Sequence, residues 1–171
     1  AVDFDDLLMK THSLFEFDKS ILQKYQDKYL YLMVDEFQDT NIAQYNIAKQ
    51  LSESHKNLCV VGDPDQSIYS WRNADIRNIL SFQTDYPEAK VISLEENYRS
   101  TKTILKGAKS LISANTSRVD KDLWTNNTEG TPIAVMEGYN EEEEAQLVIR
   151  EIGRISESGG YSLGDISVMY R

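Results

Sequence analysis

The chain has 171 residues, of which 40% are hydrophobic and 27% are charged, as in a globular protein of one or two domains. Its net charge of −10 argues against a non-specific polyanion binder, because such proteins are usually basic. The single cysteine excludes an internal disulfide. We expect no membrane association, because no apolar run reaches the roughly 18 residues of a membrane span and no signal peptide opens the chain. Since the chain begins at Ala1, we expect an internal piece of a longer protein.

Strand-like and helix-like patterns alternate along the first two thirds of the chain. Apolar periodicity predicts helices over residues 14–25, 42–51, 74–82 and 100–111, and strands over residues 29–34, 57–61 and 90–94. The strands are nearly continuous apolar runs, so we expect them to be buried on both faces. This alternation implies right-handed crossovers, and therefore an α/β fold whose parallel sheet has flanking helices.

The sequence becomes polar and turn-rich after residue 114, which predicts a linker or hinge over residues 115–131. A second short unit follows, with a strand over 132–136, a helix over 141–155 and a strand over 166–170. One such unit is too small to form a domain. We therefore expect residues 1–114 to belong to a first domain and residues 132–171 to begin a second.

Basic residues gather in one stretch of this acidic chain. Residues 99–121 carry six basic side chains and one acidic side chain, and Lys102, Lys106 and Lys109 share one face of the predicted helix. The simpler interpretation is a solvated helix face, and the alternative is a surface that contacts phosphates.

The sequence VDEFQDTN, residues 34–41, places Asp35 and Glu36 at the end of a predicted strand. In open parallel sheets this edge is where ligands bind. One carboxylate can hold Mg²⁺ while the other orients or deprotonates a water molecule, as hydrolysis of a nucleoside triphosphate requires. The alternative is an ordinary polar turn after a strand.

The sequence VVGDPDQSIYSWRNAD, residues 60–75, follows the next predicted strand. Gln66 is a neutral amide that could sense a terminal phosphate or position water. Tyr69, Trp71 and Arg72 together could form a stacking platform for single-stranded bases. The alternative is that the aromatic side chains of this segment are part of the core.

The sequence LEENYRS, residues 94–100, follows the third predicted strand. Arg99 lies where an arginine can reach the γ-phosphate as its bond breaks, and Tyr98 could stack on a purine ring. The alternative is a surface arginine that pairs with Glu95 or Glu96.

Taken together, DEFQDTN, GDPDQSIYSWR and ENYRS, each after a predicted strand and in this order, resemble the superfamily-one DNA helicases of the UvrD, Rep and PcrA type. The resemblance covers the whole chain, from the opening DFDDLL onward. It implies a RecA-like P-loop NTPase motor fold with two motor domains and ATP bound between them. Residues 1–114 would be the later part of the first motor domain and residues 132–171 the start of the second.

The resemblance also implies roles at the nucleotide site. Asp35 would be the Mg²⁺ ligand and Glu36 the catalytic base. Gln66 would couple the γ-phosphate to DNA. Arg99 would be the arginine finger, and Tyr98 would stack on the adenine ring.

For DNA, the resemblance implies that Tyr69, Trp71 and Arg72 contact the single strand, with Trp71 stacked on a base. It further implies translocation from 3′ to 5′ along single-stranded DNA and action at single-strand/duplex junctions. A role in DNA repair and a cytoplasmic, nucleoid-associated location are the corresponding expectations.

Two departures from the family pattern stand out. No GxxxxGK[ST] loop is present among these 171 residues, so we expect this chain alone to bind ATP weakly and not to hydrolyse it. Asn73 stands where the family commonly has glycine after the arginine. Because Asn tolerates the left-handed backbone better than most residues, we expect the turn to be retained.

Two alternatives remain open beside the helicase. One is the motor part of a helicase-nuclease subunit, which would carry similar motifs. The other is a noncatalytic DNA-binding scaffold that retains the fold. A scaffold has no need for both the Asp35–Glu36 pair and Arg99, which argues against it.

Overall fold

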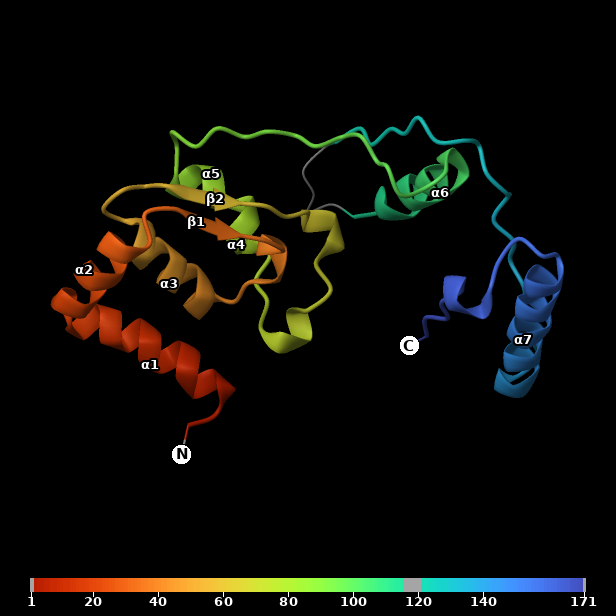
Figure 1. The fold of residues 1–171 in the computed structure, drawn as a ribbon, viewed down its shortest axis with the longest axis horizontal. Coiled ribbons are helices and arrows are strands. Elements are labelled where there is room, and N and C mark those ends of the chain that lie inside the picture. Colours follow the sequence, from red (N-terminus) through yellow and green to blue (C-terminus); the bar gives the residue numbers. More distant parts are fainter. Residues whose placement is uncertain (1, 116–120, 171) are drawn as a thin grey trace.

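The computed structural model describes residues 2–115 and 121–170 (Figure 1). In chain order its elements are α1 (Phe4–Phe17), α2 (Lys19–Lys28), β1 (Leu32–Val34), η1 (Phe37–Asp39), α3 (Ile42–Ser52), β2 (Leu58–Val60), η2 (Pro64–Gln66), η3 (Ser70–Arg72), α4 (Arg77–Leu80), α5 (Phe82–Asp85), α6 (Lys102–Ile112), α7 (Glu141–Glu157) and η4 (Leu163–Asp165), where η marks a 3₁₀ helix.

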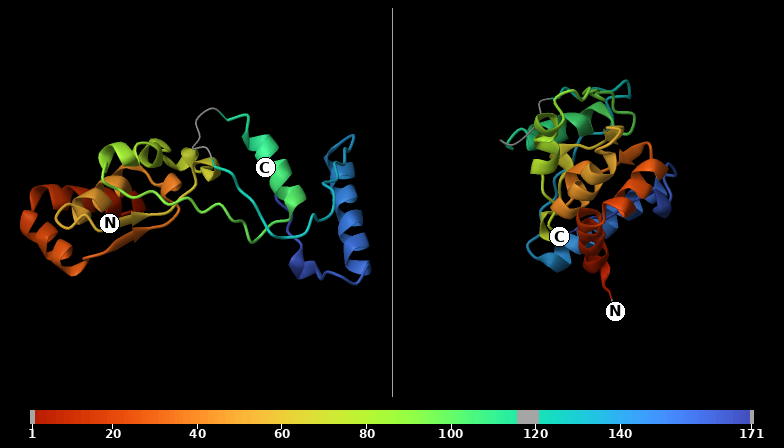
Figure 2. Two further views of the ribbon diagram at one scale, coloured as in Figure 1. Left: turned by 90° about the horizontal axis from the view of Figure 1, so that it is seen from above. Right: turned by 90° about the vertical axis from the view of Figure 1, so that its left-hand side faces the viewer.

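The centre of the first part is a parallel pair of strands, β1 and β2, with Leu32 opposite Leu58 and Val34 opposite Val60. The helices α1, α2 and α3 pack against one another on one side of the strands, and α4 and α5 lie on the other side, where α4 contacts η1 and leaves Met33 and Cys59 exposed (Figures 1 and 2). The expected class, a parallel sheet with flanking helices, is confirmed in this coarse form.

Phe37 anchors the segment that follows β1. Its side chain is fully buried. Its ring lies edge-on to Phe82 with 5.6 Å between centroids, and tilted against Tyr45 at 6.0 Å. Asn78 of α4 donates from Nδ2 to the backbone oxygen of Thr40 at 3.0 Å. The turn after β1 is therefore held between α3 and the α4–α5 pair.

The predicted helix over residues 14–25 is two helices that meet at Asp18. The Asp18 carboxylate accepts hydrogen bonds from the backbone N–H groups of Ser20 and Ile21, and so caps α2. The backbone N–H of Asp18 still bonds to Leu14 and ends α1. A side chain that satisfies the first N–H groups of a new helix competes with continuation of the old one.

The expectation that the strands are buried on both faces is wrong. Each strand has only three residues, shorter than predicted. Leu32 and Val34 are half-buried beside α1 and α3, while Met33 is 79% exposed and Cys59 is also exposed. A two-stranded sheet offers its helices one continuous apolar face, and its alternate side chains remain in solvent.

Three further predicted strands are not strands in the described structure. Residues 90–94, 132–136 and 166–170 pair with no strand, and Val91, Ile92 and Leu94 are exposed. Their apolar patterns suit strands, but a strand needs a neighbour to satisfy its backbone groups.

The predicted helices agree with the structure more closely than the predicted strands do, because a helix and its caps depend on residues close in sequence. The predicted helix 42–51 is confirmed as α3, which begins with a capping box at Asn41. The predicted helix 141–155 is confirmed as α7, capped by Asn140 with four glutamates in its first turn. The predicted helix 74–82 is instead the short pair α4 and α5. The predicted helix 100–111 is α6, which begins at Lys102 after the N-cap residue Thr101.

The helices α6 and α7 lie away from the β1–β2 sheet, joined to it by long extended segments (Figures 1 and 2). Residues 121–129 lie beside residues 95–103 and run parallel to them. An isolated parallel bridge joins Glu96 and Trp124, and the backbone N–H of Lys102 bonds to the oxygen of Thr128 at 3.2 Å. Residues 116–120 of the predicted linker, and with them Arg118 of the basic stretch, lie outside the described residues. Within the described ranges, none of the helices has both the length and the apolar character to cross a membrane.

Candidate functional site

The two carboxylates predicted for nucleotide chemistry lie at the carboxyl end of β1. Both Asp35 and Glu36 are exposed. Glu36 has a left-handed backbone, with φ of 49° and ψ of 42°, which is unusual for a residue other than glycine. Oδ1 of Asp35 accepts a hydrogen bond from the backbone N–H of Glu36 at 2.9 Å. The chain thus turns sharply where the strand ends, and both carboxylates remain at that edge of the sheet.

Gln38 is a site residue that the sequence analysis missed. Its side chain is only 1% exposed. Its Nε2 donates to Oε2 of Glu36 at 2.7 Å, and its Oε1 accepts from the backbone N–H of Asp63 at 3.0 Å. An amide suits this position because it donates and accepts at once. The only signal in the sequence is an amide inside the carboxylate-rich turn.

Gly62 permits this close approach between the ends of β1 and β2. A Cβ atom added there would lie 2.6 Å from Oε1 of Gln38 and 3.1 Å from the backbone nitrogen of Phe37. Real Cβ atoms do not come as close as 2.6 Å to another heavy atom, so a side chain at this position would push the Gln38 amide away.

The loop after β2 is organised around Asp63. Its carboxylate accepts from the backbone N–H of Asp65 at 2.9 Å and from Nε2 of Gln66 at 2.8 Å, and it forms an ion pair with Lys121. Lys121 also lies 3.5 Å from Asp65. Burial raises the pKa of Asp63, but the hydrogen bonds from Lys121 and Gln66 outweigh it, so the pKa of Asp63 lies below its ordinary value.

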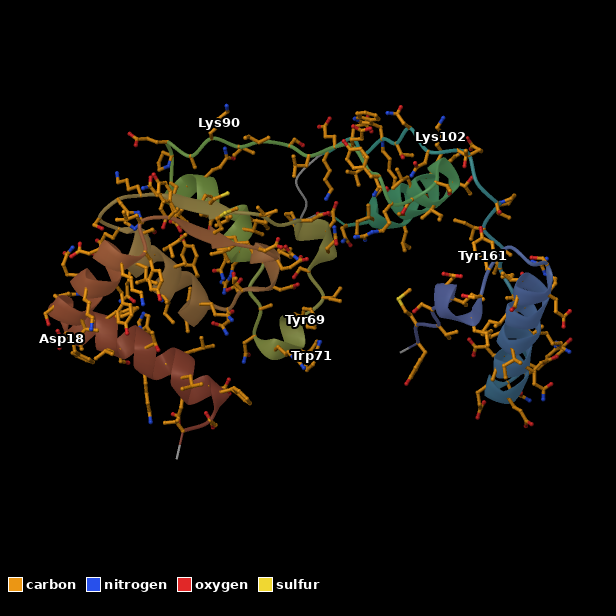
Figure 3. All side chains as sticks on the ribbon, viewed as in Figure 1. Asp18, Tyr69, Trp71, Lys90, Lys102 and Tyr161 are labelled. Atoms are coloured by element: carbon orange, nitrogen blue, oxygen red, sulfur yellow. The ribbon has the colours of Figure 1, made fainter. Side chains whose placement is uncertain are left out.

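Tyr69 and Trp71 are exposed at the tip of a loop that projects away from the sheet (Figure 3). Arg72 is also exposed, and its guanidinium lies over both rings, so the three side chains form one cluster. The ring centroids of Tyr69 and Trp71 are 6.1 Å apart, and the guanidinium carbon of Arg72 lies 4.5 Å from the Trp71 centroid. Trp71 is 70% exposed, and Ile68 before it is also exposed. The alternative that these residues belong to the core is therefore wrong for the described structure.

Asn73 follows this cluster in the left-handed backbone region, with φ of 62°. The expectation that Asn retains the turn in place of glycine is confirmed.

The ENYRS segment lies on the extended chain before α6. Oδ1 of Asn97 accepts from the backbone N–H groups of Arg99 and Ser100, at 3.0 and 2.7 Å. The Tyr98 hydroxyl donates to Glu96 at 2.6 Å, a hydrogen bond that raises the Tyr98 pKa. Arg99 is exposed and makes no ion pair with Glu95 or Glu96 within the described residues.

A cavity of about 360 Å³ adjoins the end of β1 and is lined by Asp35, Glu36, Asp39 and Thr40, among others. Oδ1 of Asp39 is buried and has no hydrogen-bond partner. Carboxylate oxygens are the ligands that Mg²⁺ prefers, and proteins usually supply one or two of them while water and substrate phosphates complete the shell. The described residues contain no cluster of three or more acidic, histidine or cysteine side chains that could hold a metal by themselves. Asp35 therefore fits Mg²⁺ carried by a nucleotide.

The structure links some of the predicted site residues and leaves others apart. Hydrogen bonds run from Glu36 through Gln38 to Asp63 and on to Gln66. In the described ranges, no hydrogen bond or ion pair joins Arg99 to this chain of contacts, and Tyr98 forms its hydrogen bonds with Glu96 and Asn127.

Comparison with known protein families gives two matches that together cover nearly the whole chain. Residues 1–87 match the UvrD/REP helicase N-terminal domain, and residues 92–171 match the UvrD-like helicase C-terminal domain. The chain belongs to the UvrD/REP helicase family.

Several members of the UvrD/REP helicase family are similar over all of this chain. The chain is 54% identical over 171 residues to the ATP-dependent DNA helicase PcrA of Staphylococcus aureus strain Mu50. It is 53% identical over the same length to the PcrA proteins of Bacillus subtilis strain 168 and Staphylococcus epidermidis strain RP62A. All 171 residues align, but they span only 23% of each of these relatives.

Proposed function

We propose that this chain is part of the motor of an ATP-dependent DNA helicase that moves 3′ to 5′ along single-stranded DNA. In this proposal residues 1–114 are the later part of a first RecA-like domain, residues 115–131 are the hinge, and residues 132–171 begin the second RecA-like domain. Membership of the UvrD/REP helicase family and the identity to PcrA helicases support the proposal.

One observation carries the proposal furthest. The Glu36 carboxylate after β1 is hydrogen-bonded through the Gln38 amide to the backbone N–H of Asp63, whose loop leads in eight residues to the exposed Trp71. A coupled motor needs a physical connection between the place where phosphate chemistry occurs and the place where bases bind. This chain of contacts is such a connection.

At the nucleotide site, Asp35 would hold Mg²⁺, which neutralises charge that develops on the phosphates. Glu36 would take the proton from the attacking water, and its hydrogen bond from Gln38 fixes the carboxylate for that task. Gln66 would contact the γ-phosphate, Arg99 would stabilise its charge in the transition state, and Tyr98 would stack on the adenine ring. No hydrogen bond or ion pair among the described residues joins Arg99 to Asp35, Glu36 or Gln66, so its role here follows from the family pattern.

At the DNA site, Trp71 would stack on a base, with Tyr69 beside it and Arg72 neutralising a phosphate. This cluster is exposed and local, so it can bind a single strand although the chain as a whole has a net charge of −10. Single-strand/duplex junctions are the expected sites of action, and the nucleoid is the expected location.

Steady-state ATP hydrolysis by the full-length protein, with and without single-stranded DNA, tests the proposal. Strong stimulation by single strands, together with unwinding of a duplex that has a 3′ tail, is the expected result. Hydrolysis without stimulation would remove the DNA roles of residues 69–72. Absence of hydrolysis would favour the noncatalytic scaffold, and DNA cleavage by the same protein would favour the helicase-nuclease subunit.

A further inference from the structure

Lys121 makes the least exposed ion pair of the described residues. Its side chain is 17% exposed, and its partners Asp63 and Asp65 are 23% and 8% exposed. In every other ion pair of the described ranges, at least one side chain is more than a third exposed. Exposed ion pairs contribute little to the free energy of unfolding. Removing one member of a buried pair is costly, because it leaves the partner's charge buried without a counter-ion.

The ion pair between Lys121 and Asp63 helps to hold the loop of residues 63–66, which carries Gln66. Asp63 accepts from Gln66 Nε2, and its own backbone N–H is held by Gln38. Without the Lys121 ammonium, the half-buried Asp63 carboxylate would lose the cation that compensates its charge, and the loop that it organises would rearrange. The position of the Gln66 amide therefore depends on a residue 55 positions further along the chain.

The segment that begins with Lys121 also holds the ENYRS segment. The backbone N–H of Trp124 bonds to the oxygen of Glu95 at 3.0 Å. Nδ2 of Asn127 donates to the backbone oxygens of Tyr98 and Ser100, at 3.1 and 3.0 Å. Residues 121–127 thus contact the Gln66 loop (residues 63–66) through Lys121, and the Arg99 loop (residues 95–100) through Trp124 and Asn127.

We propose that Lys121 is a positioning residue for ATP hydrolysis: through Asp63 it holds Gln66 at a set distance from the Arg99 loop. This inference rests on the proposed function, since it concerns the same nucleotide site. Lys121 itself touches neither substrate nor metal in this proposal. Residues 121–127 would connect the two loops rigidly, so that a displacement of either the Gln66 loop or the Arg99 loop would displace the other.

The test is Lys121→Met in the full-length protein. We expect the kcat of DNA-stimulated ATP hydrolysis to fall about 10-fold or more, because a small displacement of a positioned catalytic group slows the reaction. The KM for ATP should change less than about two-fold. Lys121→Arg should keep most of the kcat, because it restores the cation. The matched control is Lys10→Met, which removes the exposed pair with Asp6 and should leave kcat unchanged.

A double variant and a second measurement distinguish positioning from a structural role. Adding Lys121→Met to Gln66→Ala should cost little beyond Gln66→Ala alone, and additive losses would overturn the proposal. If Lys121→Met lowers Tm, kcat is measured at a temperature well below the Tm of the variant, where the loss of kcat should persist. A kcat that returns to the wild-type value at that temperature would make Lys121 merely structural.

The same experiment separates this inference from the proposed function. A wild-type protein that hydrolyses ATP, with Lys121→Met equally active, would overturn the role of Lys121 and leave the helicase assignment standing. A wild-type protein that does not hydrolyse ATP would overturn the proposed function, and the role of Lys121 would fall with it.

Discussion

At the scale of single residues, Glu36 and Gln38 show how the site depends on one tight turn. Glu36 adopts a left-handed backbone, and the buried Gln38 amide holds its carboxylate. Such a backbone costs free energy that the surrounding contacts must offset, and residues of this kind concentrate at functional sites.

In the full-length protein, Glu36→Gln should reduce kcat for ATP hydrolysis by a factor on the order of 10²–10⁴, because the variant keeps the shape of the base and loses its basicity. Binding of ATP, measured by titration with a fluorescent nucleotide, should change less than about two-fold, because no binding contact is removed. Turnover close to that of the wild type would exclude Glu36 as the base.

Trp71→Ala should weaken binding of single-stranded DNA by about 1–3 kcal/mol, the contribution of one base–aromatic stack, and should weaken DNA stimulation with it. Basal hydrolysis should be nearly unchanged, since Trp71 is exposed and distant in sequence from both carboxylates. Fluorescence anisotropy with a labelled oligonucleotide measures the first effect. Phe17→Ala, at an exposed aromatic residue in α1, is the control, and equal losses in both variants would contradict the stacking role.

At the scale of elements, the contact between the ends of β1 and β2 depends on Gly62. The register of the two strands brings the Gln38 side chain to the point where a Cβ of residue 62 would lie. The neighbouring atoms include the backbone of Phe37, which is fixed by the core and cannot yield. The two loops that carry the candidate site are therefore packed directly on one another.

Gly62→Ala should destabilise the chain by about 1–3 kcal/mol, as overpacking of a tight site does, and should displace Gln38. Gly153→Ala is the matched control, because no atom lies within 4 Å of its Cβ position in α7. That variant should be neutral or stabilise the chain by up to about 1 kcal/mol through helix propensity. Urea unfolding followed by circular dichroism measures both, and equal midpoints would show that the Gly62 contact is looser than described.

At the scale of the whole molecule, large apolar side chains remain exposed along residues 90–94 and 132–136 and in the last residues described. Their patterns are typical of strands, yet the described ranges contain no strand to pair with them. Segments of this kind gain order only when neighbouring strands are present. The relatives that align with this chain are more than four times its length.

The 171-residue chain alone should therefore bind ATP weakly and should not hydrolyse it, with or without single-stranded DNA. The physical reason is that the β- and γ-phosphates need backbone amides and a lysine of the GxxxxGK[ST] kind, which these 171 residues do not contain. A phosphate-release assay on the purified chain checks this, with the full-length protein as the positive control. Turnover stimulated by DNA in the isolated chain would contradict it.

The sequence alone determined the features that depend on neighbouring residues. The caps at Asn41 and Asn140 begin α3 and α7 where predicted, and Asn73 adopts the left-handed turn that its side chain tolerates. The polar residues 35–36 and 63–66 were predicted at strand ends because apolar runs stop before them. These signals are local, so apolar periodicity and the backbone preferences of single residues suffice to find them.

Only the tertiary structure revealed the contacts between distant parts of the chain. Gln38 meets Asp63 because the parallel register of β1 and β2 brings their ends together, and Lys121 meets Asp63 across 58 positions. No periodic pattern marks either contact, because each is set by where the chain folds back. Burial of the strands was mispredicted for the same reason: it depends on the layers that cover a sheet, which lie elsewhere in the chain.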